Sequence, residues 1–162
     1  MAFRAVTRRA AFARPAIAAR AFHSTPRAFV RVGDEIPDLN VLVEDSPANK
    51  VNLADEFKSA NGLIIGLKEA GSVFVVSVND PFVMKAWADQ MDPAQQTGIR
   101  FLGDPTAEFT KALDLGWDGS AIFGGIRSKR YALVVENGTV KSAHVEPDNT
   151  GTAVAMADKV LG

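Results

Sequence analysis

The chain has 162 residues, 47% of them hydrophobic, and a formal net charge of −1, which suits one domain with a buried core and a short tail. It contains no cysteine, which excludes disulfides, zinc thiolates and thiol nucleophiles, and its two histidines, His23 and His144, are too far apart in sequence to favour a metal site. The longest stretch without a charge, residues 70–79, is too short to cross a bilayer as a helix, so no membrane span is expected. Separately, we expect no cofactor.

Residues 1–27 form a basic segment with six arginines and no acid, and the first acidic residue of the chain is Asp34. Segments rich in Arg and Ala that lack acids are typical of mitochondrial transit peptides, which form basic amphipathic helices. The residues from Arg20 to Ser24 resemble a matrix-protease cleavage region. We therefore expect a presequence over residues 1–27, a domain over residues 28–162, and a location in the mitochondrial matrix.

Two other interpretations of the basic segment compete. A secretory signal needs an apolar core of at least about seven residues, and Arg14 and Pro15 interrupt the only candidate. A nucleic-acid-binding arm would usually carry Lys and less Ala and Phe. Cleavage near Arg27 would leave 12 Lys and Arg against 19 Asp and Glu, and such an acidic domain disfavours nucleic acid as a partner.

The first elements after this segment alternate apolar runs with turn signals. Residues 39–43 predict a strand and residues 46–49 predict a turn. Asn52 is a suitable N-cap for a short helix that directs Phe57 inward. Two buried strands are predicted from the apolar runs at residues 62–66 and 73–78.

A helix is predicted from Asp80 onward, because Asp is a favourable N-cap and the proline that follows it is tolerated at the first helical position. Val83, Trp87 and Met91 recur every four residues along this helix. This spacing predicts one apolar face, with Trp87 packed in the core.

The next segment repeats the pattern of a strand followed by a helix. Residues 99–102 predict a strand, and Asp104 followed by proline predicts a second helix start. Phe109 and Leu113 would share the inner face of this helix, and Gly116 is a suitable stop.

The last part of the chain predicts a β-hairpin and a helix. Residues 131–135 and 139–145 are the strands, and Asn137-Gly138 between them is a tight-turn signal. A helix is expected over about residues 152–161. Strands that alternate with helices and end in a hairpin indicate an α/β fold with a mixed central sheet flanked by helices.

Several short blocks of sequence occur in an order that is specific as a series, although no single block is. They are VGDEIP at 32–37, NKVNL at 49–53, SVNDPFV at 77–83, DPTAEF at 104–109, IFG at 122–124, RSKRY at 127–131 and VEPD at 145–148. With Trp87 between them, these blocks resemble the type-five, atypical subgroup of the peroxiredoxins, from about residue 31 to residue 162.

The resemblance implies a thioredoxin-like fold and a thiol peroxidase that acts in antioxidant defence and redox homeostasis. Its partners would be hydroperoxides and a thiol reductant, either glutathione with glutaredoxin or thioredoxin, and a homodimer is one expected assembly. In this family a cysteine thiolate attacks one peroxide oxygen and becomes a sulfenic acid, which a second thiol reduces. A threonine and an arginine position the peroxide and stabilise the developing charge.

By this resemblance, a segment of the family is missing between Gly66 and Leu67. It would hold the Pro-x-x-x-Thr-x-x-Cys motif and the helix behind the cysteine, and the resemblance resumes directly on both sides. A clean internal loss is more typical of a skipped exon or a gene-model error than of gradual decay. The family's resolving cysteine would fall near Val154, which carries no sulfur.

The family's arginine corresponds to Arg130, which stands just before the strand at 131–135. The resemblance implies that Arg130 is a relict anion-binding residue, which would face an incomplete site. Without the resemblance, the more natural interpretation is a solvated basic strand end formed by Arg127, Lys129 and Arg130, because charge clusters are usually solvated faces.

The missing segment also poses a problem for the fold. In a thioredoxin fold the strands at 62–66 and 73–78 would be parallel neighbours, which usually need a crossover of about a dozen residues or more. Only residues 67–72 connect them, so the sheet is expected to be locally disrupted between Gly66 and Leu67. The alternatives are a direct return that leaves one sheet face without its helix, or an antiparallel hairpin.

Three functional interpretations remain at this stage. The first is a mitochondrial peroxiredoxin whose present chain lacks its catalytic segment and is inactive. The second is a non-catalytic module that pairs with full-length peroxiredoxin subunits. The third is an unrelated protein with a thioredoxin fold.

Overall fold

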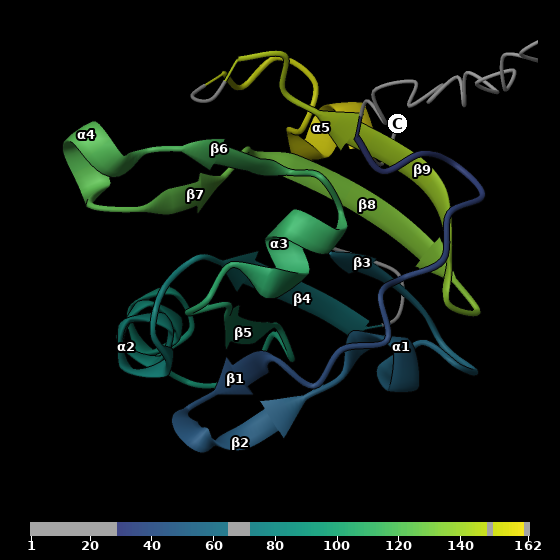
Figure 1. The fold of residues 1–162 in the computed structure, drawn as a ribbon. Helices are drawn as coiled ribbons and strands as arrows, with labels where there is room; N and C mark the ends of the chain where they lie inside the picture. The colour runs from purple at the N-terminus through teal and green to yellow at the C-terminus, as the bar shows by residue number, and fades with distance from the viewer. Residues whose placement is uncertain (1–28, 65–71, 149–150, 161–162) are drawn as a thin grey trace, which may run out of the picture.

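The computed structural model describes residues 29–64, 72–148 and 151–160, and its main feature is a seven-stranded sheet in the order β2-β1-β5-β4-β3-β8-β9 (Figure 1). A separate two-stranded sheet pairs β6 with β7. The strands are β1 Leu42–Glu44, β2 Ser46–Val51, β3 Asn61–Ile64, β4 Ser72–Ser77, β5 Arg100–Gly103, β6 Gly116–Asp118, β7 Ile126–Ser128, β8 Tyr131–Glu136 and β9 Thr139–Val145. The helices are α1 Leu53–Glu56, α2 Pro81–Met91, α3 Glu108–Ala112, α4 Ser120–Phe123 and α5 Ala157–Val160.

The sheet is mixed, as the sequence predicts. β4 runs parallel to both β3 and β5, whereas β8 is antiparallel to β3 and β9. β3 and β4 pair Leu63 with Val73 and Ile64 with Phe74, so the parallel alternative holds and the antiparallel hairpin is wrong. The expected disruption between Gly66 and Leu67 lies outside the described residues.

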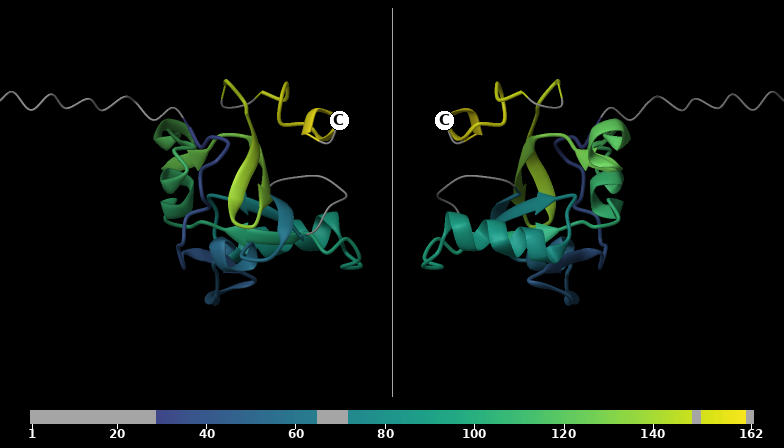
Figure 2. Two further views of the ribbon diagram at one scale, coloured as in Figure 1. Left: turned by 90° about the vertical axis from the view of Figure 1, so that its right-hand side faces the viewer. Right: turned by 90° about the vertical axis from the view of Figure 1, so that its left-hand side faces the viewer.

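Helices α2 and α3 cover opposite faces of this sheet (Figure 1, Figure 2). Successive side chains of a strand point to opposite faces, and on β5 the side chain of Phe101 packs with Met84 of α2. The next residue, Leu102, packs in the main core with Phe109 and Leu113 of α3. The shared inner face of Phe109 and Leu113 is thereby confirmed.

The predicted turn at residues 46–49 is wrong, because these residues belong to β2. The chain instead reverses at Asp45, which has a positive φ of 58° between Glu44 and Ser46. β2 is an edge strand of the sheet, where Pro47 does not remove a hydrogen bond that the sheet needs.

Helix α1 begins as predicted. The Asn52 side-chain oxygen accepts a hydrogen bond from the N–H of Ala54 at 3.0 Å. Phe57 is fully buried and makes an edge contact with Phe74, with ring centroids 5.3 Å apart.

Helix α2 also begins as predicted, since the Asp80 carboxylate accepts the N–H groups of Phe82 and Val83, each at 2.9 Å. Its predicted core face is wrong. Val83 and Met91 are 47% and 65% exposed, and Met84 is the fully buried side chain that packs against the sheet. Trp87 is 42% exposed, but its ring makes an edge contact with Phe101 of β5 at a centroid distance of 5.2 Å, so Trp87 packs against the sheet only in part. A period of four residues fixes which side chains share a face of the helix, and it leaves open which face meets the sheet.

The second Asp-Pro pair, Asp104-Pro105, does not start its helix directly but forms a turn that precedes the helix. Ala107 has a φ of 56° and its N–H donates to the Asp104 carbonyl, so α3 begins only at Glu108. The predicted stop at Gly116 is also too late. α3 ends at Ala112, and Asp114 has the positive φ that follows the helix.

The C-terminal hairpin is confirmed, with Asn137 and Gly138 both at positive φ as a tight hairpin turn requires. The predicted helix over residues 152–161 is too long, because α5 spans only Ala157–Val160 and residue 161 lies outside the described residues. The Glu146 carboxylate accepts the N–H groups of Val154 and Ala155, which holds this stretch in a non-helical form.

Candidate functional site

The candidate site is the end of the sheet where β3 stops and β8 starts. β3 and β8 are antiparallel, with Ile64 opposite Leu133, so the last residue of β3 lies beside the first residues of β8. Arg130 immediately precedes β8 and therefore stands at this end of the sheet. By the resemblance of the sequence, the missing segment would lie at the same end, shortly after β3.

Arg130 is exposed, and its main-chain carbonyl accepts the N–H of Glu146 at 3.0 Å. Among the described residues, no hydrogen-bond or ion-pair partner is found for its guanidinium. The side chain therefore keeps its donors available for an anion. The predicted catalytic role of Arg130 stays a prediction.

Arg127 and Lys129, the two neighbouring cations, are not free. The guanidinium of Arg127 donates to the carbonyls of Val78 and Phe123, and it lies 5.3 Å from the centroid of the Phe123 ring. The ammonium of Lys129 lies 4.3 Å from the centroid of the Phe29 ring. Arg127 thus ties the β6-α4-β7 segment to the end of β4. Sequence reasoning missed this clamp, because nothing in the RSKR stretch distinguishes its cations.

Tyr131, the residue after Arg130, belongs to a group of three buried polar side chains. Tyr131, Asp104 and Thr110 are all fully buried, and the Asp104 carboxylate accepts the N–H of Thr110 at 2.8 Å. Within the described residues, the hydroxyl of Tyr131 has no hydrogen-bond partner. Burial, and then the negative charge of Asp104, raise the pKa of Tyr131 well above its usual range. A phenol that stays neutral and shielded from solvent cannot act as the missing nucleophile.

Glu146 fixes the segment that carries Val154. Its carboxylate accepts the N–H of Val154 at 2.9 Å and the N–H of Ala155 at 2.8 Å, although the side chain is 1% exposed. Burial raises the pKa of Glu146, but the backbone N–H groups of residues 153–155 outweigh it, so its pKa lies below the usual range. Val154, near which the resemblance places the family's resolving cysteine, is thereby held at the surface and is 37% exposed.

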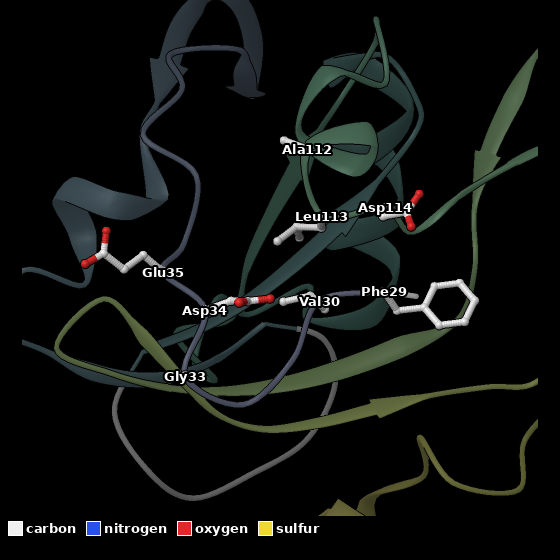
Figure 3. A pocket seen from close by; sticks show the side chains of 8 residues that line it. All are labelled: Phe29, Val30, Gly33, Asp34, Glu35, Ala112, Leu113 and Asp114. Carbon is white, nitrogen blue, oxygen red and sulfur yellow. The ribbon is translucent and has the colours of Figure 1, made fainter. Parts of the chain in front are cut away.

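A hollow of about 460 Å³ opens between the first described residues and the end of α3 (Figure 3). Of the described residues, those that line it include the three carboxylates of Asp34, Glu35 and Asp114 and no lysine, arginine, histidine, serine or threonine. It therefore offers no nucleophile and no cation for an anionic substrate. The residues that line it are Phe29, Val30, Gly33, Asp34, Glu35, Ala112, Leu113 and Asp114.

The described residues contain no cluster of three or more His, Cys, Asp or Glu side chains that could hold a metal ion. Their helices are all too short or too polar to cross a bilayer.

Comparison with known proteins places the chain in a family. The Redoxin family model matches residues 65–161. Peroxisomal membrane associated protein 20 of Schizosaccharomyces pombe is 46% identical over 102 residues, which are 63% of this chain and 65% of that protein. The mitochondrial peroxiredoxin-2F of Arabidopsis thaliana is 40% identical over 95 residues, 59% of this chain and 46% of that protein. The chain thus spans less than two thirds of the length of these relatives.

Solved structures agree with the sequence relatives. Peroxiredoxin 5 from Alvinella pompejana superposes with a TM-score of 0.63 and 32% identity over 75% of this chain and 92% of its own. Reduced Prx3 from Vibrio vulnificus gives a TM-score of 0.69 and 29% identity over 82% of this chain and 96% of its own.

The two kinds of match differ in extent. The structural match to Prx3 covers more residues than 65–161 contain, so part of the chain before residue 65 shares the fold as well. The family-model match begins directly after β3, where the sequence analysis finds the family pattern interrupted. The family-model match, the sequence relatives and the thioredoxin-like fold show that the chain belongs to the Redoxin family as a peroxiredoxin, although its sequence contains no cysteine.

Proposed function

We propose that this chain is a thiol-free mitochondrial variant of a hydroperoxide-reducing peroxiredoxin, and that it does not itself turn over hydroperoxides. The observation that carries the proposal is the absence of cysteine from all 162 residues. Peroxidase turnover in this family passes through a thiolate and a sulfenic acid. Without a thiol, the chain has neither the nucleophile nor the group that a thiol reductant would regenerate.

The position of Arg130 supports this descent from a peroxidase. Its exposed guanidinium stands at the end of the sheet where the missing segment would follow β3. An arginine there would stabilise both a thiolate and the charge that develops on the peroxide. In the present chain it is an anion-binding residue without its nucleophile.

Peroxidase assays test the proposal. The purified metal-free chain should show no turnover of hydrogen peroxide or alkyl hydroperoxides with glutathione and glutaredoxin or with a thioredoxin system. Turnover above a no-protein control would contradict it. A matched variant with a family-like Pro-x-x-x-Thr-x-x-Cys segment inserted between Gly66 and Leu67 should gain activity, and the same insert with Ser for Cys should not.

A second function, pairing with full-length peroxiredoxin subunits, is favoured by the exposed apolar side chains of two helices. Phe82 and Val83 on α2 are 63% and 47% exposed, and Ile122 and Phe123 on α4 are 78% and 52% exposed. Large apolar side chains gathered at a surface are typical of association sites. Co-expression with a full-length subunit should give a complex that co-elutes in size-exclusion chromatography. Elution of this chain alone, or only as a homodimer, would contradict the pairing.

The mitochondrial location is part of the same proposal. It rests on the six arginines without acids in residues 1–27 and on relatives that include mitochondrial peroxiredoxin-2F proteins. Other relatives carry peroxisomal names. A reporter fused to residues 1–27 should enter mitochondria and lose the segment there. A reporter found in peroxisomes or in the cytosol would contradict this location.

A further inference from the structure

The sulfur of this chain is confined to four methionines. Three of them lie in the described residues, and their exposure differs widely. Met91 is 65% exposed and Met156 is 41% exposed, whereas Met84 is fully buried against the sheet. Met84 and Met91 belong to the same helix, α2, so they differ in access to solvent rather than in secondary structure.

We propose that Met91 is a site of reversible oxidation by hydroperoxides. A lone pair of the thioether sulfur attacks one peroxide oxygen, the O–O bond breaks, and an S–O bond forms. The attacked oxygen gives up its own proton to the departing oxygen, which leaves as water or an alcohol. The sulfur loses the two electrons that the hydroperoxide gains, and the product, methionine sulfoxide, is returned to methionine by methionine sulfoxide reductases.

The absence of cysteine makes this reaction the main sulfur chemistry open to the chain. In a protein with a reactive cysteine, the thiolate is the nucleophile that meets an oxidant first. Here no thiol competes, and a peroxide that reaches the surface meets thioether sulfur instead. Oxidation of Met91 needs no peroxidase turnover, because each methionine takes up one oxygen and then does not react further until it is reduced.

The position of Met91 gives its oxidation a local consequence. Met91 ends the exposed apolar stripe of α2 that also contains Val83 and Trp87. Oxidation converts a flexible apolar side chain into a polar one. The stripe then loses its most exposed member, so the oxidised chain should bind less hydrophobic dye than the unoxidised chain.

Tryptic mapping tests the site directly, because the three methionines fall in separate peptides, 69–85, 86–100 and 142–159. The folded full chain is treated with hydrogen peroxide or tert-butyl hydroperoxide, and each peptide is followed by mass spectrometry over time. Oxygen should enter Met91 at least roughly tenfold faster than Met84. Fragment ions separate Met91 from Trp87, which lies in the same peptide, and a methionine sulfoxide reductase should reverse the change.

Two conservative variants serve as matched controls. Met91→Leu keeps an apolar side chain of similar volume and should abolish the peroxide-dependent loss of dye binding. Met84→Leu should leave that loss unchanged. Equal oxidation rates at Met84 and Met91 in a chain that circular dichroism shows to be folded would overturn the proposal, as would unchanged dye loss in Met91→Leu. Peroxide consumption beyond one oxygen per methionine would instead contradict the proposed lack of turnover.

Discussion

The two faces of the central sheet are covered to different degrees. On the face toward α3, the side chains of Ile64, Phe74 and Leu102 are completely shielded from solvent. Their strand neighbours point to the face toward α2, and there Leu63 is 5% exposed while Val73, Val75 and Phe101 are each 8% exposed. Among the described residues, the first face belongs to a large core cluster of 17 buried residues, whereas the buried residues of the second cluster are Val75, Met84 and Phe101.

This difference shows where the missing segment would matter. A helix that follows β3 would have to cover one face of the sheet, and the α3 face is already closed. The α2 face has a thin cover, and the apolar stripe of α2 itself is exposed. The exposed apolar surface expected from the missing segment therefore lies on the α2 side of the molecule. Most of it belongs to the side chains of α2 rather than to the strands beneath it.

Two phenylalanines on opposite faces provide the test with the largest expected effect. Phe74→Ala removes a fully buried ring from the closed face, and Phe-to-Ala changes in cores cost about 3–5 kcal/mol. Phe101→Ala removes the same ring from the thinly covered face, where the cost should fall at or below the lower end of that range. Urea denaturation measures both. Equal losses for the two variants would show that the faces are equally well packed.

Restoring the missing cover is the second test. A family-like segment inserted between Gly66 and Leu67, with Ser at the cysteine position, separates the structural effect from the chemical one. If it buries one large apolar side chain of the α2 face, it should add about 1.5–3 kcal/mol, raise the melting temperature and reduce dye binding. Equal melting temperatures and equal dye binding would mean that the short chain is already well packed.

Most of the sheet could be predicted from the sequence, because buried strands appear as short apolar runs and the Asn-Gly turn fixes its hairpin. The cap at Asn52 was also predictable, because it is a local interaction in which the side chain accepts a hydrogen bond from an N–H only two residues away. The errors have a common physical origin in tertiary context. Nothing local indicates that α2 would bury Met84 completely and leave Trp87 half-exposed at the edge of its contact with Phe101. Nor does it indicate that Glu146 would hold residues 154 and 155 out of a helix.

The candidate site was predictable only in part. The role of Arg130 was inferred from its place in the family blocks and stays a prediction; Arg130 lies three residues before Leu133, which pairs with Ile64 at the end of β3. The buried group of Tyr131, Asp104 and Thr110 was missed, because its members are 21 or more residues apart in two of the three pairs and show no shared pattern in the sequence. The clamp formed by Arg127 was missed for another reason: its acceptors are main-chain carbonyls, which every residue carries, so the sequence does not mark them.

Tyr131 tests how completely the α3 face is closed. Its ordinary pKa is 10.0, and burial followed by the charge of Asp104 raises the pKa of the folded state. Above pH 10 the unfolded tyrosine therefore releases its proton while the folded one keeps it, so folding stability falls as the pH rises. Tyr131→Phe should remove this loss, and at neutral pH it should change stability by no more than about 1 kcal/mol because the lost hydroxyl has no partner.

Denaturation of both forms at pH 7 and at pH 10.5 measures the effect. A wild-type chain whose stability changes no more than that of Tyr131→Phe would mean that water reaches the phenol and that the α3 face is open there.

The smallest expected effect on stability concerns the exposed stripe of α2. Val83 is 47% exposed, so Val83→Gln should change the free energy of unfolding by no more than about 0.5 kcal/mol, as surface substitutions usually do. It should still lower dye binding, because the removed side chain belongs to the stripe. Val76 supplies the matched comparison, since it is 1% exposed in the closed core and Val76→Gln would bury an amide at a cost of about 1–3 kcal/mol or more. If Val83→Gln destabilised the chain as much as Val76→Gln, the stripe would have to be covered in solution, and the difference between the two sides of the sheet would disappear.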